Sequence, residues 1–230
     1  MINRPVIQIA GVLDQQEAFM LCDSGVTHIG FPLRLAYHPE DLSDRQAHDI
    51  ISGLPEDVSK VLITYLTAAS EIGELARYLG TDTVQLHSQP SRESLAQLRT
   101  MAPELRIIRS LIVGEADVTD LAREARAQSD LVDFFLTDTY DPATGASGAT
   151  GKTHDWKISR VLARRCGRPL ILAGGLKATN VRQAIREVEP AGVDAHTGVE
   201  GPDGRKDLRL VEAFVREAQF GFREVKDESR

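Results

Sequence analysis

Short apolar runs alternate with amphipathic segments from one end of this 230-residue chain to the other. The run VIQIA at 6–10 precedes a segment whose apolar residues recur at helical spacing. The run KVLITYL at 60–66 precedes EIGELARYLG, where Gly80 suits a helix end. Strands that alternate with helices favour a parallel α/β sheet in which helices form the crossover connections.

The alternation gives eight strand–helix units, which is the number that closes a (β/α)8 barrel of about 250 residues. A doubly wound open sheet shares the same alternation and is the structural alternative, but the count of eight favours the barrel. We expect one barrel domain over 1–222 and a solvated C-terminal tail over 223–230. The expected strands are 6–10, 28–33, 60–66, 83–87, 105–113, 131–138, 170–172 and 192–198.

The bulk composition excludes several classes of protein. A net charge of −7 argues against a nucleic-acid partner, because binding phosphate backbones requires a basic surface. No segment approaches the roughly 18 apolar residues of a membrane span, and the first residues lack the long apolar part of a signal peptide. Two cysteines, Cys22 and Cys166, do not suggest a disulfide scaffold. We expect a cytoplasmic chain without nucleic-acid or membrane partners.

The stretch RPLILAGGLKATNV at 168–181 combines a buried-looking strand, two glycines and an expected helix over Lys177–Glu187. Backbone N–H groups at glycines and at a helix start are the ingredients of an anion site. A tight αβ connection is the alternative interpretation. In barrels, phosphate often binds the loops after strands seven and eight. We therefore expect phosphate to bind at Gly174, Gly175, Thr197 and Gly198.

Six pieces in order resemble the phosphoribosylanthranilate isomerase family of tryptophan biosynthesis: IGF (29–31), VQLH (84–87), TDT (137–139), GKTHDW (151–156), LAGGLKATNV (172–181) and VDAHTGVEGPDGRKD (193–207). The resemblance implies a (β/α)8 barrel with no metal and no organic cofactor. It implies an Amadori rearrangement, in which a phosphoribosylamine opens, loses a proton at C2 and becomes a 1-amino-ketose. The expected partner is a phosphorylated small molecule, and the expected state is a monomer or homodimer.

Such a rearrangement needs a general acid at the ring oxygen and a general base at C2. The resemblance assigns the acid to Asp138, for which a loop cap or salt-bridge partner is the alternative role. The family's base is a cysteine in a Lys-Ile-Cys-Gly sequence, which here reads Gln8-Ile9-Ala10-Gly11. A methyl group cannot accept a proton. Cys22 and Cys166 fall on expected helices and do not replace the thiol.

A second departure concerns the arginine that the family uses to hold the anthranilate. Glu40 stands at the corresponding place in LRLAYHPEDLS, and a carboxylate there repels a carboxylated ring. Arg34 is the available substitute. The phosphate glycines are thus present, while both groups specific for anthranilate are absent.

Several side chains at the strand ends are further site candidates. His196 replaces the small serine usual in the family, and it is a candidate base or phosphate partner, with a packed loop residue as the alternative. Gln85, His87 and Asp194 are expected to bind the substrate. The remaining histidines show no metal-site spacing, and they are His28, His38, His48 and His154.

The segment 139–154 is long for a connection inside a compact barrel, and its glycines indicate a lid over a ligand or else a spacer. The leading hypothesis is an isomerase-like enzyme acting on a phosphorylated sugar that differs from phosphoribosylanthranilate. The alternatives are phosphoribosylanthranilate isomerase with a substituted base, and a non-catalytic phosphometabolite-binding protein.

Overall fold

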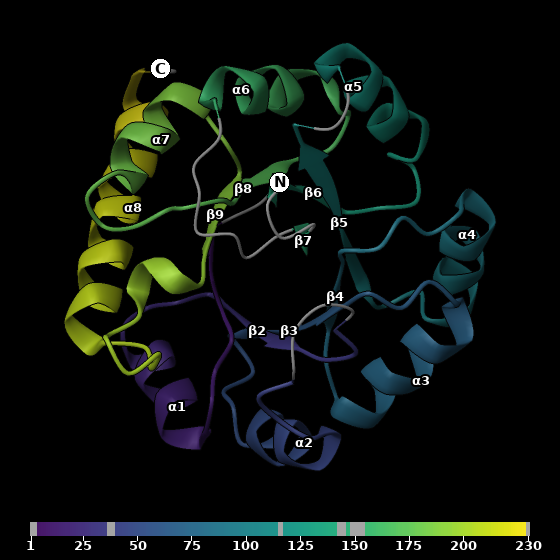
Figure 1. Cartoon of the computed structure of the whole chain (residues 1–230), viewed down its shortest axis with the longest axis horizontal. Coiled ribbons are helices and arrows are strands. Elements are labelled where there is room, and N and C mark those ends of the chain that lie inside the picture. The colour runs from purple at the N-terminus through teal and green to yellow at the C-terminus, as the bar shows by residue number, and fades with distance from the viewer. Residues whose placement is uncertain (1–3, 36–39, 115–116, 142–145, 148–154, 229–230) are drawn as a thin grey trace.

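A closed ring of parallel strands lies inside a ring of helices in the computed structural model, which describes residues 4–35, 40–114, 117–141, 146–147 and 155–228 (Figure 1). The pairings β1–β9 and β5–β6 close the ring, which confirms the expected (β/α)8 barrel. A short strand, β7 (Ala146–Ser147), pairs antiparallel with β6. The eight barrel strands are β1 (Val6–Ala10), β2 (His28–Pro32), β3 (Ser59–Thr64), β4 (Thr83–Leu86), β5 (Arg106–Val113), β6 (Phe134–Asp141), β8 (Leu170–Leu172) and β9 (Gly192–Ala195).

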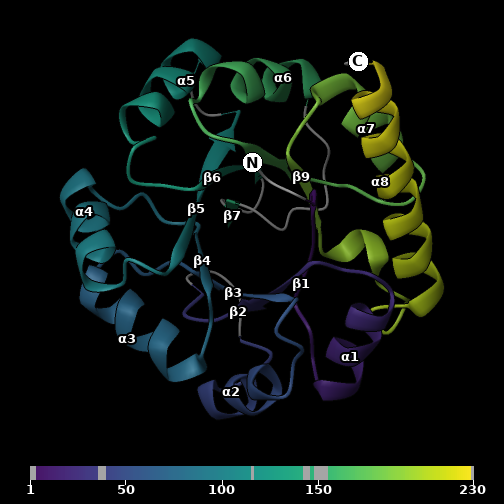
Figure 2. The same cartoon turned by 180° about the vertical axis from the view of Figure 1, so that it is seen from behind.

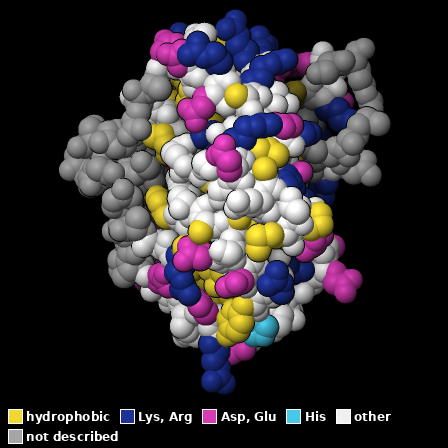
Figure 3. All heavy atoms as spheres, turned by 90° about the vertical axis from the view of Figure 1, so that its right-hand side faces the viewer, with side chains coloured by type: hydrophobic (Ala, Val, Ile, Leu, Met, Phe, Trp, Pro, Cys, Tyr) yellow, Lys and Arg dark blue, Asp and Glu magenta, His cyan; other side chains and the backbone are white. Residues whose placement is uncertain are grey.

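Eight α-helices surround the strands in the described part of the chain, and the view from behind shows the same outer ring (Figure 2). On the flank seen in Figure 3, acidic and basic side chains are interspersed over the helices. None of the described helices has the length and apolar character needed to cross a bilayer. The helices are α1 (Gln15–Asp23), α2 (Asp44–Ser52), α3 (Ala69–Leu79), α4 (Arg92–Met101), α5 (Val118–Ala127), α6 (Trp156–Arg165), α7 (Val181–Val188) and α8 (Leu208–Glu228).

The expected helix boundaries on α2 and α3 are confirmed by their caps. Ser43 caps α2 in a capping box with Gln46, which satisfies backbone N–H groups at the helix start. Gly80 ends α3 in the left-handed conformation, with φ 75°, which glycine adopts without steric cost. These local signals fix where each crossover helix begins and ends, and therefore where the following strand enters the barrel.

Alternation along the strands separates two apolar clusters. Ile7 and Ile9 on β1 point outward to the helices, while Val6 and Ala10 belong to a smaller cluster inside the barrel. The inner cluster fills the barrel interior, and at its upper end Ala10 faces the opening at the carboxyl ends of the strands. The other members of the inner cluster are Val61, Ile63, Ile108, Leu136, Ile171 and Ala173.

Two helices differ from the sequence expectation. α7 begins at Val181 instead of Lys177, because the Asn180 side chain accepts from the Lys177 N–H and donates to the Gly175 carbonyl, which holds the intervening residues in a turn. α8 continues through 223–228, within the segment 223–230 expected as a solvated tail, and Val225 packs against the outer cluster, while 229–230 lie outside the described residues.

The expected lid over 139–154 is described only in part. Its first residues extend β6 to Asp141, and backbone pairing joins Tyr140 to Ser147 and Asp141 to Ala146. The segments 142–145 and 148–154 lie outside the described residues. The described part is therefore a short hairpin that continues from β6.

Closure of the barrel depends on the close approach of β1 to Gly192 on β9. A Cβ atom on Gly192 would lie 2.4 Å from the Val6 Cβ atom. We predict that Gly192→Ala lowers the free energy of unfolding by about 1–3 kcal/mol through overpacking. Gly73→Ala on α3 is the matched control, because its added methyl group would meet its nearest atom at 3.8 Å and should stabilise the helix slightly. Equal denaturation midpoints for the two variants would contradict the prediction.

Candidate active site

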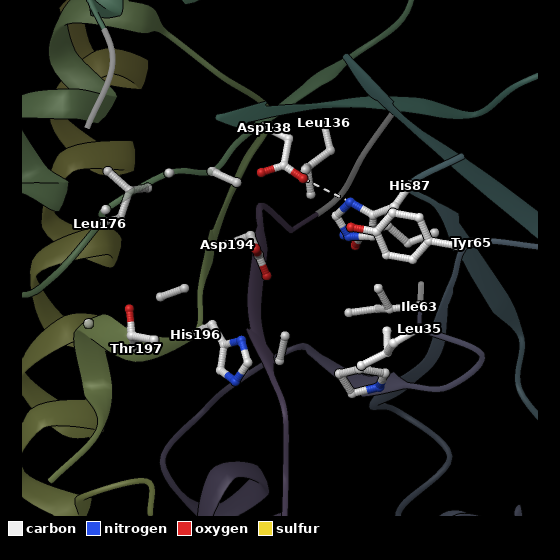
Figure 4. A pocket seen from close by; sticks show the side chains of 18 of the residues that line it. Leu35, Ile63, Tyr65, His87, Leu136, Asp138, Leu176, Asp194, His196 and Thr197 are labelled. Atoms are coloured by element: carbon white, nitrogen blue, oxygen red, sulfur yellow. Dashed lines mark hydrogen bonds and ion pairs between the residues drawn. The ribbon is translucent and has the colours of Figure 1, made fainter. Parts of the chain in front are cut away.

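A pocket of about 300 Å³ opens at the carboxyl ends of the barrel strands, where barrel enzymes place their chemistry. Figure 4 shows its side chains converging from the barrel wall on a common space. The structure brings nine of the ten expected site residues into the lining of this pocket: Gln85, His87, Asp138, Gly174, Gly175, Asp194, His196, Thr197 and Gly198.

Arg34, the tenth expected residue, does not line the pocket. Its guanidinium binds both carboxylate oxygens of Asp44, at 2.9 and 2.6 Å, and this hydrogen-bonded pair raises the pKa of Arg34. Glu40 accepts from the Arg34 backbone N–H at 2.5 Å and lies 3.6 Å from its guanidinium. Two acidic side chains thus engage the charge of Arg34 in this structure, and its binding of the substrate stays a prediction.

The end of the pocket near β2 and β3 is mainly apolar. Leu35, Ile63 and Tyr65 line it, and Figure 4 shows them on the side of the pocket opposite Leu176 and Thr197. Asp41 adds a carboxylate to the lining. This end suits a flat apolar group.

Asp138 is held in place by His87. The His87 Nδ1 atom lies 2.8 Å from Asp138 Oδ2, and the Asp138 side chain is buried. His87 Nε2 lies 3.0 Å from the Gln85 amide nitrogen, which can only donate, so Nε2 accepts and the ring proton resides on Nδ1. His87 therefore donates to Asp138 and fixes the direction of its carboxyl group.

The hydrogen-bonded chain continues across the barrel floor to a second carboxyl group. Gln85 Oε1 accepts from Gln8 Nε2 at 2.6 Å, and Gln8 hydrogen-bonds Asp194. The β1–β9 register sets Gln8 directly beside Asp194. Three side chains thus link the carboxyl groups of Asp194 and Asp138.

Asp194 has an unusual protonation equilibrium. Burial raises the pKa of its carboxyl group to about 7, with a further rise from the charge of Asp138 and an opposing effect of the Gln8 hydrogen bond. Among the described residues, Asp194 Oδ1 is buried and has no hydrogen-bond partner. Perturbed carboxyl groups in a cleft are typical of functional sites.

Ala10 and His196 lie side by side at the mouth of the barrel. The register pairs Ile9 with Ala195, so one further step places His196 next to Ala10, at the end of β1. The imidazole packs on Gly11, where an added Cβ atom would lie 2.3 Å from His196 Nε2. Glu200 Oε1 is 3.3 Å from His196 Nε2. Cys22 and Cys166, on and just after outer helices, do not line the pocket.

The opposite end of the pocket consists of closely packed backbone. Gly174 and Gly175 have φ values of 103° and 60°, which favour glycine. A Cβ atom on Gly198 would lie 1.9 Å from the Leu176 carbonyl oxygen, so only glycine lets these two loops meet. Thr197 begins a short 3₁₀ helix, η1 (Thr197–Val199). Closely packed backbone from the two loops therefore forms this end of the pocket.

Comparison with known proteins decides the family. A family model described as N-(5'-phosphoribosyl)anthranilate isomerase matches residues 7–217. The chain belongs to the phosphoribosylanthranilate isomerase family. It is 36% identical over 222 residues to N-(5'-phosphoribosyl)anthranilate isomerase 2 of Methanosarcina mazei, covering 96% of this chain and 97% of that protein.

Solved structures of phosphoribosylanthranilate isomerases are also similar to this chain. The phosphoribosyl anthranilate isomerase of Thermotoga maritima is 28% identical, with a TM-score of 0.78 over 94% of this chain and 100% of that one. A phosphoribosyl anthranilate isomerase in complex with reduced 1-(o-carboxyphenylamino)-1-deoxyribulose 5-phosphate is 26% identical, with a TM-score of 0.75 over the same shares of both chains.

Sequence reasoning missed residues of this family site that lack an obvious chemical signature. Gln8 stands two positions before Ala10, so strand alternation could have placed both inside the barrel. Lys206 lies in the stretch 193–207 that resembles the family, but its role was not predicted because it arises from tertiary contacts. Its buried ammonium donates to Glu200 at 2.6 Å and thereby supports the β9–η1 turn.

We predict that inorganic phosphate binds at Gly174, Gly175, Thr197 and Gly198. Gly198→Ala should weaken phosphate binding by at least about tenfold, roughly 1.4 kcal/mol, because its methyl group would push the two loops apart. Isothermal titration with phosphate measures this, and sulfate soaks locate the anion in crystals. Gly73→Ala serves as a remote control. An anion bound elsewhere, or unchanged affinity in Gly198→Ala, would overturn the assignment.

Proposed function

We propose that the chain is an isomerase that performs the Amadori rearrangement of a phosphorylated ribosylamine. The observation that carries this proposal is the position of Asp138. Its carboxyl group is oriented by His87 and lies between a glycine-lined end suited to phosphate and an apolar end suited to the nitrogen substituent. Membership of the phosphoribosylanthranilate isomerase family supports the same reaction.

In the proposed reaction the glycine turns hold the phosphate and Asp138 gives a proton to the ring oxygen. The bond between C1 and that oxygen breaks, and the nitrogen forms a protonated Schiff base. A base then removes the proton from C2, and the electron pair forms a C1=C2 bond. The resulting enol becomes the 1-amino-ketose. C1 is reduced and C2 is oxidised within one molecule, so no external oxidant or reductant is needed.

Ala10 cannot supply the base, although it lines the pocket at the end of β1. Two titratable groups flank it. His196 lies beside Ala10, where it is placed to act as a base or to meet the phosphate, and Asp194 lies one layer deeper, beside Gln8. Either group can accept a proton near neutral pH.

Two substrates are supported by separate observations. Phosphoribosylanthranilate is supported by the names of the relatives. A ribosylamine whose substituent lacks a carboxylate is supported by the apolar lining of Leu35, Ile63 and Tyr65, the nearby Asp41, and the engaged charge of Arg34.

The discriminating experiment compares kcat/KM for phosphoribosylanthranilate with that for the matched N-phosphoribosylaniline. Preference for the aniline compound supports the uncarboxylated substrate, whereas preference for the anthranilate compound supports the tryptophan-pathway reaction. Binding of both compounds without turnover would overturn the enzyme proposal and favour a binding protein.

Asp138→Asn tests the general acid. The amide keeps the shape of the side chain but cannot transfer the proton, so we predict a fall in kcat of about 10²–10⁴-fold. Phosphate affinity should change little, because the glycine turns lie on other strands. Steady-state kinetics and phosphate titration measure the two effects. Turnover equal to that of the parent protein would remove the acid role.

Restoring the two family groups tests the interpretation of their loss. We predict that Ala10→Cys combined with Glu40→Arg raises phosphoribosylanthranilate turnover, because a positioned base contributes about 10²–10⁴-fold. The single variants separate the base from the carboxylate-binding group. Robust turnover by the parent chain, with no gain in the double variant, would show that another group already fills the role of the base.

A further inference from the structure

We propose that Asp194 is the general base that removes the C2 proton in place of the thiol missing at Ala10. The inference rests on the proposed Amadori reaction and names the residue that removes the C2 proton. It chooses between the two groups that flank Ala10, and it makes Asp194 a reacting group rather than a substrate-binding residue.

The position of Asp194 matches this role. Its carboxyl group points into the pocket from β9, and only β8 separates this strand from β6, which carries Asp138, so two carboxyl groups face the space between the phosphate end and the apolar end (Figure 4). Gln8 hydrogen-bonds the group from β1. Its Oδ1 atom is shielded from solvent and has no hydrogen-bond partner among the described residues, so the negative charge on this group has little compensation.

The surroundings make Asp194 a stronger base than an ordinary carboxylate. Its strand neighbour is the neutral amide of Gln8, and burial raises the pKa of the carboxyl group to about 7. A base is most effective when its pKa lies near the working pH. The charged or titratable groups around Asp194 are Asp138 on β6, His87 on β4, Lys206 before α8, and His196 and Glu200 at the β9–η1 turn.

His196 is less well placed for the same step. Its Nε2 atom faces Glu200 and the backbone of Gly11 at the mouth of the barrel. The Lys206 ammonium also donates to Glu200 and thereby fixes the position of the Glu200 carboxylate. His196 thus lies nearer the β9–η1 turn, beside Thr197 and Gly198, where a role toward the phosphate fits its position.

The proposed step transfers one proton from C2 of the substrate to Asp194. Asp194 begins as a carboxylate, and one oxygen takes the proton from C2 of the protonated Schiff base. The C–H electron pair forms the C1=C2 bond, and the C=N π pair moves to the nitrogen. The enol later loses its hydroxyl proton and gains a proton at C1, which yields the ketose.

The test compares Asp194→Asn with His196→Gln, using whichever of the two ribosylamines the parent protein converts. Asp194→Asn should lower kcat by at least about 10²-fold. His196→Gln should mainly raise KM. Adding Ala10→Cys to Asp194→Asn should recover a large part of the lost kcat, because the thiol restores a proton acceptor beside C2. A merely structural carboxyl group would not be rescued in this way.

The pH profile gives an independent readout. In the parent protein kcat/KM should rise as pH increases through about 7, because the raised pKa keeps Asp194 protonated, and inactive as a base, below that value. Gln8→Lys places a cation beside the carboxyl group, lowers its pKa and should shift this rise to lower pH. If a thermal melt reveals that Asp194→Asn does not fold, Gln8→Lys still tests the proposal, because it keeps the Asp194 carboxyl group.

The outcomes separate the two proposals. Loss of kcat in His196→Gln with little loss in Asp194→Asn, or an unchanged profile in Gln8→Lys, would overturn the role of Asp194 and leave the isomerase function standing. Absence of turnover by the parent protein with either ribosylamine would overturn both. Loss in Asp194→Asn, rescue by the thiol and the shifted profile together would support the assignment.

Discussion

The pairing of β1 with β9 is the contact on which the barrel and its site both depend. It closes the ring of strands, and its register aligns Val6 with Gly192 and Gln8 with Asp194. The first pair brings the two backbones close together because position 192 has no side chain. The second pair places a neutral amide against a half-buried carboxyl group whose Oδ1 atom is shielded from solvent. A shift of one residue would turn Asp194 out of the barrel, because side chains alternate along a strand.

The electrostatics of the pocket follow from how each buried charge is partnered. Lys206 and Glu200 form a close pair beneath the mouth, and Asp138 is paired with His87. Within the described residues, the Gln8 amide hydrogen-bonds Asp194, the charges of His87 and Lys206 act on it, and its Oδ1 atom has no hydrogen-bond partner. Burying a carboxylate with so little compensation is costly, and proteins retain such groups mainly where protonation has a use. The contrast between the two aspartates therefore carries more functional information than the pocket's overall charge.

Much of the barrel could be predicted because its signals are local. Apolar runs predicted the strands and helical periodicity predicted the helices. Ser43 marked the start of α2 through its side-chain cap, and Gly80 marked the end of α3 through its left-handed backbone. Signals that depend on distant or competing contacts were missed. Asn180 delays α7 by bonding the glycine turn, and Val225 carries α8 onward by packing on the core.

In the candidate site, too, local signals could be predicted and distant contacts could not. Nine of its residues lie at strand ends, which alternation and the barrel rule identify from sequence. The engagement of Arg34 by Asp44 required knowledge of how a loop folds back on a helix. The link from Gln8 to Asp194 required the closure of the ring, which no local pattern encodes.

That closure also has a consequence for how the molecule is made. The two strands that close the ring are far apart in the sequence, since β1 precedes the other barrel strands and β9 follows them. A growing chain can form helices and neighbouring strands early, but contacts between distant segments form late and slowly. The exposed edges of β1 and of the strands awaiting it must therefore survive unpaired until β9 leaves the ribosome. The lining of the pocket is therefore completed only when β9 joins β1, because Asp194 and His196 enter it with that pairing.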